Sequence, residues 1–307
     1  MKVLVTGGTG FVGREVVRQL HAAGHTPRLL VRSVIPPVVT ELASRFGAEV
    51  FTGNVLDVPP LQLAMRDCDA VIHLVGIISE VGEQTFENIH VRGTRDVVRA
   101  AQAVGVKRFV HMSALGTRPG AASRYHQSKW SAEEFVRSSG RAWTIFRPSI
   151  IYGPGDGFVN LFARMAKFSP VVPLIGGGVT KFQPISVENV ARAFVAALGE
   201  PASVHQTFDL VGEEVLSLRQ IVEAVLHVTN RRRLKLPLPF AVANLQAAVA
   251  EILFAKLLRK PPPLNRDQVT MLRTDNVSET HQADELFGLR HERFADGIAR
   301  YLSGCRA

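Results

Sequence analysis

Short apolar stretches alternate with amphipathic ones along the first half of the chain. Continuous apolar runs, typical of strands that are covered on both faces, occur at 2–6, 27–32, 48–52, 69–75, 107–112 and 142–147. Apolar positions at helical spacing fill most of the gaps, notably at 11–23, 84–103 and 124–138. This alternation predicts an α/β fold with a doubly wound parallel sheet and right-handed crossovers.

In such a sheet, ligands bind beyond the carboxyl ends of the strands. The residues expected at those ends are Gly7, Arg32, Asn54, Leu74 and Ser113.

The pattern changes after Arg147-Pro148, where Pro and Gly punctuate the chain. An apolar helix is expected near 158–168, and a helix at 187–198 with one apolar side is expected to return to the main sheet. We therefore predict a sheet domain at 1–150 and a smaller, mainly helical substrate or lid lobe at 151–307.

A glycine-rich turn joins the first strand to the first helix. Gly7 permits a turn that a Cβ would obstruct, Gly10 lets the main chain approach a phosphate, and Gly13 lets the helix lie close to the strand. The unpaired N–H groups and the positive dipole end of that helix would face the anion. An apolar strand before the turn and helical spacing after it make the motif specific. Residues 1–150 are therefore expected to be an NAD(P)-binding Rossmann domain. Gly7, Gly10 and Gly13 are expected to bind the pyrophosphate, and the further cofactor-binding residues expected in this turn are Thr9, Phe11 and Val12.

The end of the second strand favours NADP over NAD. NAD-binding folds commonly place an acid about 20 residues beyond the glycines, whereas a basic residue there accommodates the 2′-phosphate of NADP. No Asp or Glu occurs between Val16 and Thr40, and Arg32 follows the strand. A guanidinium can bind a phosphate through two hydrogen bonds. We predict NADP(H), with NAD as the alternative, and the alternative for Arg32 is an ordinary exposed cation.

Candidate acid–base chemistry lies at Tyr125-His-Gln-Ser-Lys129, which puts a phenol and an ammonium on one helix face. Ser113 stands at the end of the strand before that helix. Lys129 would stabilise the tyrosinate and lower the pKa of Tyr125, and Ser113 would hold the same substrate oxygen. A Tyr and Lys at this spacing often form an ordinary helix face, but their position in a dinucleotide fold favours catalysis.

The overall composition indicates the cellular compartment and argues against some kinds of site and partner. The chain has 307 residues, a formal net charge of +9 and two cysteines, Cys68 and Cys305, which cannot form a disulfide framework or a metal cluster. The expected location is therefore cytoplasmic, with no metal and no secretory signal. Nucleic acid is not an expected partner, because the basic stretch lacks interleaved aromatic residues. Oligomeric state cannot be predicted from these features.

These motifs together resemble the short-chain dehydrogenase/reductases of the extended or atypical type. The resemblance rests on the glycine turn, His73-Leu-Val-Gly76, Gly93-Thr94, Ser113, the Tyr125/Lys129 pair and Arg147-Pro148-Ser-Ile-Ile-Tyr-Gly153. Thr180–Val187 and Leu236-Pro-Leu-Pro-Phe240 narrow the resemblance to bacterial relatives of the 39-kDa, NDUFA9-type accessory subunit of respiratory complex I. Nucleotide-sugar epimerases are similar more distantly.

The resemblance implies roles for further residues. Asn54 and Val55 would flank the adenine, Leu74, Val75 and Gly76 the nicotinamide-side ribose, and Pro148 the nicotinamide edge. Three departures weaken the transfer of enzymatic function. Asn54 stands where the family usually has Asp. His90 replaces the Asn that holds a proton-relay water, although an imidazole can also bind water. The aromatic residue that epimerases carry after Ser113 is missing.

Residues 231–260 combine an apolar stretch with basic clusters on both sides. One interpretation is a helix that lies on the inner face of an anionic membrane. The other, which we favour on sequence, is a lid helix over the substrate cleft, because Asn244, Gln246 and Glu251 interrupt the apolar pattern. The same polar residues argue against a membrane span.

The sequence thus favours an NADP(H)-dependent oxidoreductase that acts on a hydrophobic, lipid- or quinone-like carbonyl or alcohol. One alternative is a nucleotide-binding structural or assembly subunit with little turnover. Another is a nucleotide-sugar epimerase or dehydratase, for which Arg147, Arg164 and Lys181 could bind a second diphosphate. The catalytic candidates are Ser113, Tyr125, Lys129 and His90.

Overall fold

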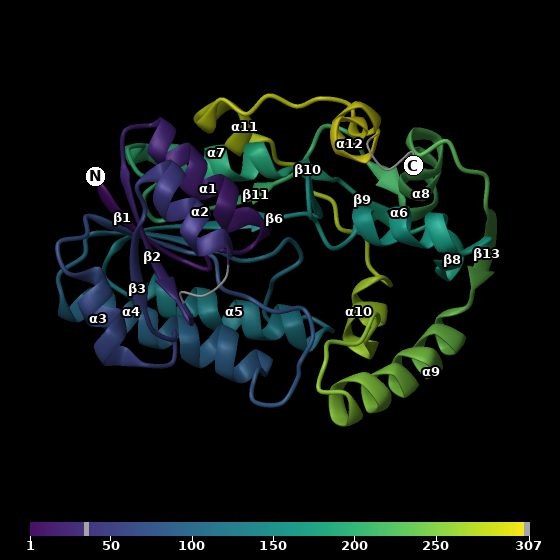
Figure 1. Cartoon of the computed structure of the whole chain (residues 1–307), viewed down its shortest axis with the longest axis horizontal. Coiled ribbons are helices and arrows are strands. Elements are labelled where there is room, and N and C mark those ends of the chain that lie inside the picture. The colour runs from purple at the N-terminus through teal and green to yellow at the C-terminus, as the bar shows by residue number, and fades with distance from the viewer. Residues whose placement is uncertain (34–36, 304–307) are drawn as a thin grey trace.

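The computed structural model describes residues 1–33 and 37–303. Its centre is a seven-stranded parallel sheet in the order β11-β6-β5-β4-β1-β2-β3 (Figure 1). The strands are β1 (Lys2–Thr6), β2 (Thr26–Val31), β3 (Glu49–Thr52), β4 (Ala70–His73), β5 (Arg108–Met112), β6 (Ala142–Pro148) and β11 (Gln206–Leu210). The predicted doubly wound α/β class is confirmed, and all six predicted strands are present. The seventh, β11, was not predicted.

Helices cover both faces of this sheet. On one side lie α1 (Phe11–Ala22), α2 (Pro37–Phe46), α7 (Val187–Ala196) and α11 (Gln282–Phe287), and on the other α3 (Val58–Met65), α4 (Gly93–Ala103) and α5 (Arg124–Arg137) (Figure 1). The helix predicted at 84–103 begins instead at Glu87, as a π-helical segment, η1 (Glu87–Arg92), that runs into α4.

The strands alternate their side chains between two hydrophobic cores because each strand is covered on both faces. In β1, Val3 and Val5 pack on the α1 and α7 side, whereas Leu4 packs on the opposite side. Val5 is in register with Leu29 of β2 and Ile72 of β4. This register brings the carboxyl ends of neighbouring strands to one edge.

A second lobe has its own core. It contains α6 (Val159–Phe168), β8 (Val171–Ile175), the 3₁₀ turn η2 (Gly176–Gly178), α8 (Leu218–Val228), β13 (Leu234–Leu238) and α12 (Phe294–Leu302). Strands β8 and β13 pair in parallel. Short pairs join β7 (Ile151–Tyr152) to β10 (Ile185–Ser186) and β9 (Lys181–Phe182) to β12 (Leu216–Ser217). A 3₁₀ turn, η3 (Pro201–Ser203), precedes β11.

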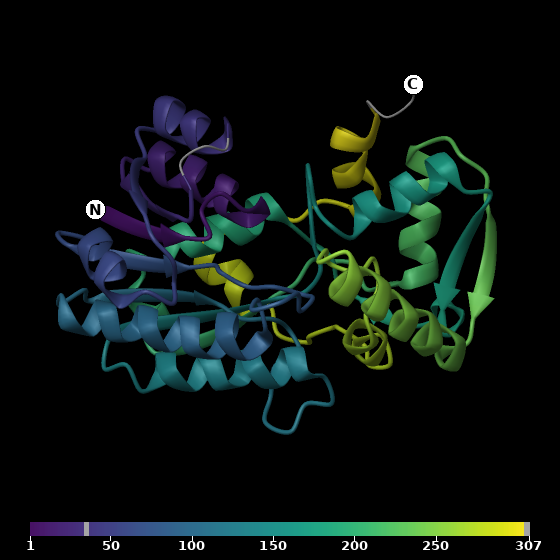
Figure 2. The same cartoon turned by 60° about the horizontal axis from the view of Figure 1, so that its bottom comes forward.

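A helical arm projects from this lobe towards the sheet half (Figures 1 and 2). It consists of α9 (Phe240–Ala250), the π-helical η4 (Glu251–Leu257) and α10 (Arg266–Met271). Within 1–33 and 37–303, no helix combines the length and apolar character needed to cross a membrane.

The division of the chain at residue 150 stays a prediction. The structure shows that later segments also join the core on the α1 side of the sheet: Val190 and Phe194 of α7, Phe208 of β11 and Phe287 of α11 are buried in it. Cys68 is buried, and Cys305 lies outside the described residues.

Candidate active site

The β1–α1 turn has the shape of a phosphate cradle. Gly7 has a φ of +80°, and a Cβ there would lie 3.2 Å from the backbone of Leu74 and Val75, so this turn lies directly beside the end of β4. A Cβ at Gly13 would overlap the carbonyl oxygen of Gly7. The N–H of Gly10 donates to that oxygen at 3.0 Å. Only residues without side chains fit this packing.

The beginning of α1 is suited to an anion. Its N-cap, Gly10, supplies no capping side chain, and its first turn contains no acid. The amides of the first helical turn therefore keep their capacity to donate hydrogen bonds, and the helix dipole adds positive potential. These residues fit the pyrophosphate of a dinucleotide.

The other predicted cofactor contacts line the same edge of the sheet. Arg32 is exposed just after β2. Asn54 is exposed and accepts a hydrogen bond from the amide of Leu56 at 3.2 Å. Val55 is buried beside Gly93, and Pro148 ends β6. The structure thus places these residues along one edge of the sheet, and their contacts with a cofactor stay predictions.

Tyr125 and Lys129 lie on α5, one turn apart, near the ends of β4 and β5. Lys129 Nζ donates to the carbonyl oxygen of Met112 at 3.1 Å, the residue just before Ser113. A Cβ at Gly76 would lie 3.0 Å from Lys129 Nζ and 3.4 Å from His90 Nε2. Within the described chain, the hydroxyl of Tyr125 makes no hydrogen bond, which leaves it able to bind another group.

Ser113 is buried directly after β5. Its amide donates to the carbonyl oxygen of Phe146 at 2.7 Å, and its hydroxyl donates to Thr117 Oγ1 at 3.3 Å. The long side-chain hydrogen bond is weak, so this hydroxyl can reorient towards a ligand oxygen.

His90 is held by protein groups at both ring nitrogens. The amide of Ile77 donates to Nε2 at 3.0 Å, so the proton of the neutral ring is on Nδ1, which donates to Ser128 Oγ at 2.8 Å. Ser128 Oγ in turn donates to the carbonyl oxygen of Tyr125 at 2.7 Å. His90 therefore connects the loop after β4 to the helix of Tyr125. In this arrangement no nitrogen is left for a relay water.

Burial shifts the pKa values of these groups. It raises the pKa of Tyr125 to about 12 and lowers the pKa of Lys129 to about 8, although Glu133 one turn along α5 favours the charged lysine. Burial also lowers the pKa of His90 to about 2, with a smaller effect of Lys129. The expected lowering of the tyrosine pKa by Lys129 is thus absent from the protein alone, because the ammonium binds Met112 rather than the phenol.

Arg147 is unable to serve a second diphosphate as it stands. Its guanidinium makes two hydrogen bonds, of 2.8 and 2.6 Å, with the fully buried Glu133, which also pairs with Arg137. Withdrawing Arg147 would break both of its hydrogen bonds to Glu133 and leave Arg137 as the remaining partner of that buried carboxylate. Arg164 and Lys181, the other two candidates, are exposed.

The second lobe contacts this site through side chains that the sequence analysis missed. The carboxylate of Asp267 accepts hydrogen bonds from the amides of Arg124 and Tyr125, at 2.8 and 3.0 Å. Asn265 Nδ2 donates to the carbonyl oxygen of Ile78 and to Ser79 Oγ. Asn276 Nδ2 donates to the carbonyl oxygen of Leu115. The Asn265–Gln268 capping box signals the start of α10, but no local pattern reveals which helix Asp267 would contact.

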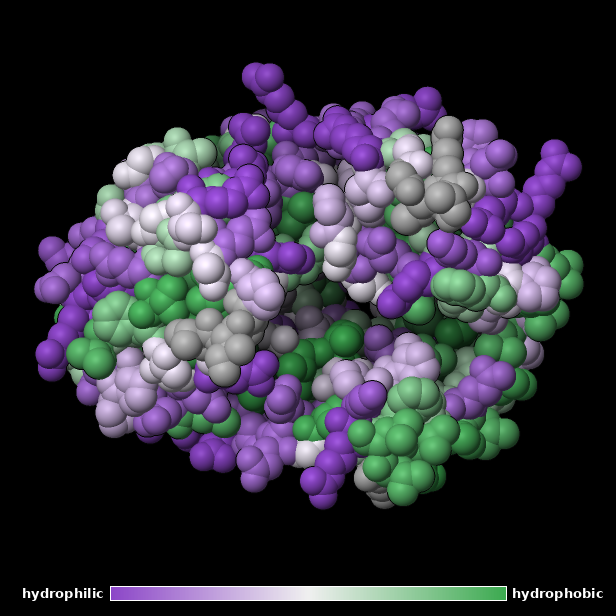
Figure 3. All heavy atoms as spheres, viewed as in Figure 1, coloured by the Kyte–Doolittle hydropathy of each residue, from purple (hydrophilic) through white to green (hydrophobic). Residues whose placement is uncertain are grey.

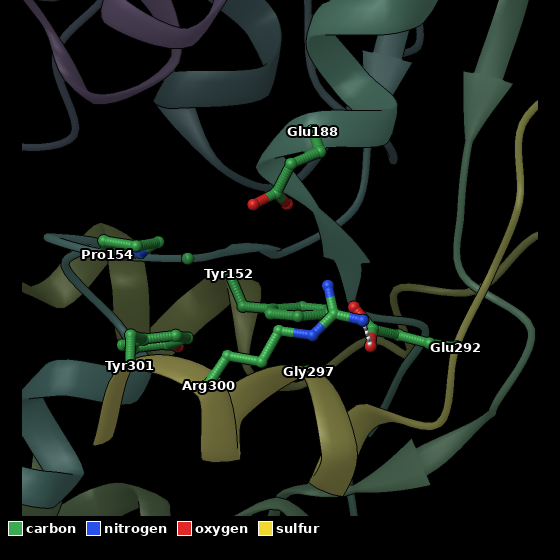
Figure 4. A pocket seen from close by; sticks show the side chains of 8 residues that line it. Tyr152, Pro154, Glu188, Glu292, Gly297, Arg300 and Tyr301 are labelled. Atoms are coloured by element: carbon green, nitrogen blue, oxygen red, sulfur yellow. Dashed lines mark ion pairs between the residues drawn. The ribbon is translucent and has the colours of Figure 1, made fainter. Parts of the chain in front are cut away.

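A separate small pocket, of about 80 Å³, lies between α7, α12 and the loop after β7 (Figure 4). Tyr152, Glu188, Arg300 and Tyr301 line it, and Arg300 is paired with Glu292 at 2.5 Å. Tyr301 Oη donates to Asp156 at 3.0 Å. Because none of the catalytic candidates lines this pocket, it is not part of the candidate active site.

A parallel sheet whose first helix opens on such a glycine cradle is the architecture of NAD(P)-binding Rossmann proteins. Residues 7–201 match a family model described as NAD(P)H-binding. The chain therefore belongs to the NAD(P)H-binding family.

Two relatives are similar to this chain in sequence over most of its length. The mitochondrial NADH dehydrogenase [ubiquinone] 1 alpha subcomplex subunit 9 of Arabidopsis thaliana is 32% identical over 281 residues, 89% of this chain and 70% of that protein. The ceramide reductase of Caulobacter vibrioides is 32% identical over 240 residues, 77% of this chain and 74% of that protein. The predicted resemblance to the complex I accessory subunit is confirmed.

Among solved structures, a UDP-glucose 4-epimerase from Thermotoga maritima with UDP-glucose has a TM-score of 0.77 at 21% identity, and the match covers 100% of this chain and 99% of that one. At this identity the likeness shows the fold alone. The predicted similarity to the epimerases is thus confirmed at the level of the fold.

Proposed function

We propose that this chain is an NADP(H)-dependent oxidoreductase that acts on a hydrophobic, lipid- or quinone-like carbonyl or alcohol. The observation that carries the proposal is the phenol of Tyr125, which makes no hydrogen bond to any described residue and lies one turn from Lys129 near the ends of β4 and β5. The relative named for ceramide reduction supports a lipid-like substrate. The proposal also includes peripheral contact of segment 231–260 with the inner face of a membrane, where such substrates reside.

In this proposal, the bound cofactor supplies or accepts a hydride at the substrate carbon. Tyr125 gives its proton to the carbonyl oxygen during reduction and takes one from the alcohol during oxidation. Ser113 turns its hydroxyl from Thr117 to the same oxygen. Lys129 would turn from the carbonyl oxygen of Met112 towards the phenol, where its positive charge favours the tyrosinate. His90 acts as a positioning residue that fixes α5 against the loop after β4.

The test is turnover with NADPH and long-chain ketones, monitored by loss of NADPH absorbance. Tyr125→Phe should lower turnover about 10²- to 10⁴-fold, because general acid–base catalysis is worth that much. Thermal stabilisation by NADPH should be retained. Tyr152→Phe, a buried tyrosine outside the site, is the matched control and should leave turnover unchanged. Equal turnover in Tyr125→Phe and the wild type would refute the assignment.

The preference for NADP rests on Arg32. Arg32→Asp should weaken NADPH binding about 10- to 100-fold, because charge-assisted hydrogen bonds to the 2′-phosphate are lost, while NADH binding should weaken little. Titration of both nucleotides against both proteins measures this. Equal affinity of the wild type for NADPH and NADH would contradict the proposal.

A structural or assembly role with little turnover is the second candidate. The occupied ring of His90 favours it, since the imidazole does not hold a relay water. Strong stabilisation by NADPH without turnover on any long-chain carbonyl would support this role. The nucleotide-sugar alternative is weaker because Glu133 already binds Arg147.

A further inference from the structure

The helical arm shows an inverted pattern of burial. Its small residues Ala243 and Ala247 are fully buried against Val269 of α10. Its large aliphatic residues face outward, with Leu245 67% and Ile252 60% exposed. Soluble proteins normally bury large aliphatic side chains, so their exposure here favours contact with an apolar partner.

The exposed residues form one continuous ridge. They follow the spacing i, i+3, i+7, i+10 and i+11, which places them on one side of the helix, and Leu257 and Leu258 extend the row. The members of this apolar ridge are Val242, Leu245, Val249, Ile252, Leu253, Leu257 and Leu258. Figure 3 shows the hydrophobic surface gathered over the arm, next to the hollow at the centre of that face. Contiguous exposed apolar surface of this kind marks an interaction site.

Charge around the ridge is positive. Residues 227–260 contain seven Lys and Arg and a single acid, Glu251, and one of the seven, Lys235, pairs with Glu223 of α8 at 2.6 Å. Glu251 is neutralised by Arg266, whose Nε lies 2.9 Å from its carboxylate. Arg232, Arg259 and Lys260 are exposed, and no carboxylate in the described part of the chain pairs with them.

We propose that the apolar ridge docks in the plane of an anionic lipid bilayer, with the flanking Arg and Lys residues at the headgroups. The ridge carries no aromatic side chain, whereas protein interfaces are enriched in Tyr, Trp and Phe. Aliphatic side chains bordered by cations suit acyl chains beneath anionic headgroups.

The docked arm would lie next to the candidate active site. Glu251 of η4 accepts a hydrogen bond from the amide of Arg266, the first residue of α10, at 2.7 Å. The next residue, Asp267, accepts from the amide of Tyr125. Docking would thus place the candidate active site at the membrane surface. This inference rests on the proposed function, because it names the residues and the lipid chemistry of the membrane contact that the proposed function includes.

The experiment is flotation of the full chain with vesicles at low salt. One set contains equal parts of phosphatidylglycerol and phosphatidylcholine, and the other contains phosphatidylcholine alone. Leu245→Glu with Ile252→Glu should lower the vesicle-bound fraction at least about tenfold, because two apolar anchors become anions near an anionic surface. Leu63→Glu, at a similarly exposed leucine on α3, is the matched control and should float like the wild type.

Binding of the wild type to the anionic vesicles, its loss in the ridge variant and its retention in Leu63→Glu together support the proposal. A wild type that ignores anionic vesicles overturns it, as does equal loss in Leu63→Glu. Self-association that the ridge variant abolishes, without vesicle binding, would instead make the ridge a protein interface. Stabilisation of the same variants by NADPH reports separately on the cofactor site, so failure of docking and failure of the proposed function are distinguishable.

Discussion

At the scale of single residues, three buried histidines differ in how their nitrogens are satisfied. His73 bonds to Thr6 and Thr94, and His90 bonds to Ile77 and Ser128. His111 stacks on His73 with ring centroids 5.3 Å apart, but neither of its nitrogens has a partner in the described residues. An unpaired buried polar group costs about 1–3 kcal/mol of stability.

Replacing His111 should therefore stabilise the fold. His111→Leu removes the unpaired nitrogens and keeps a similar volume, so the free energy of unfolding should rise by about 1 kcal/mol. His73→Leu is the matched contrast, because it leaves Thr6 and Thr94 without partners and should lower stability. Urea unfolding measures both, and a less stable His111→Leu would contradict the expectation.

At the scale of elements, the beginning of α5 is capped from a distant part of the chain. Ser123 accepts from the amide of His126, and Asp267 accepts from the amides of Arg124 and Tyr125. An acid at the positive end of a helix is favourable. The position of Tyr125 therefore depends on α10.

Asp267→Ala should lower stability by about 1 kcal/mol, as loss of a cap does, and should also lower turnover severalfold, because α5 loses its anchor. Asp275→Ala is the control: Asp275 accepts from the amide of Lys181 within the second lobe and does not touch α5. It should lower stability without a comparable loss of turnover at temperatures where both variants are folded. If the two variants lose turnover equally, Asp267 has no positioning role.

Element patterns explain which features could be predicted. The six strands that were predicted are continuous apolar runs, and the glycine turn is a local motif with one structural solution. The strand β11 has the sequence Gln-Thr-Phe-Asp-Leu, in which polar residues obscure the apolar signal. The orientation of His90 and the contact of Asp267 with α5 depend on tertiary packing, which has no local sequence signature.

At the scale of the whole molecule, burial makes the fold sensitive to acid. It lowers the pKa of His73 to about 3 and of His90 to about 2, and it lowers the pKa of His111 well below the ordinary 6.5. Below pH 6.5 the unfolded chain therefore binds protons that the folded chain does not bind. The contribution of these neutral rings to the free energy of unfolding is therefore fully present above pH 6.5 and decreases as the pH falls below that value.

We expect the free energy of unfolding to fall by up to about 1.4 kcal/mol per pH unit for each of these histidines between pH 6 and 4. Urea unfolding across this range gives the slope, and His111→Leu should reduce it by one histidine's share. A stability independent of pH over this interval would rule out neutral buried rings.

The order of segments in the main sheet has a consequence for biosynthesis. Strand β11 pairs with β6, and α7 and α11 cover the same core, yet all three are encoded after residue 186. A nascent chain that has emerged only to residue 150 therefore exposes the free edge of β6 and an uncovered sheet face. Ribosome-bound chains would need to be shielded from aggregation until β11 and α11 are made.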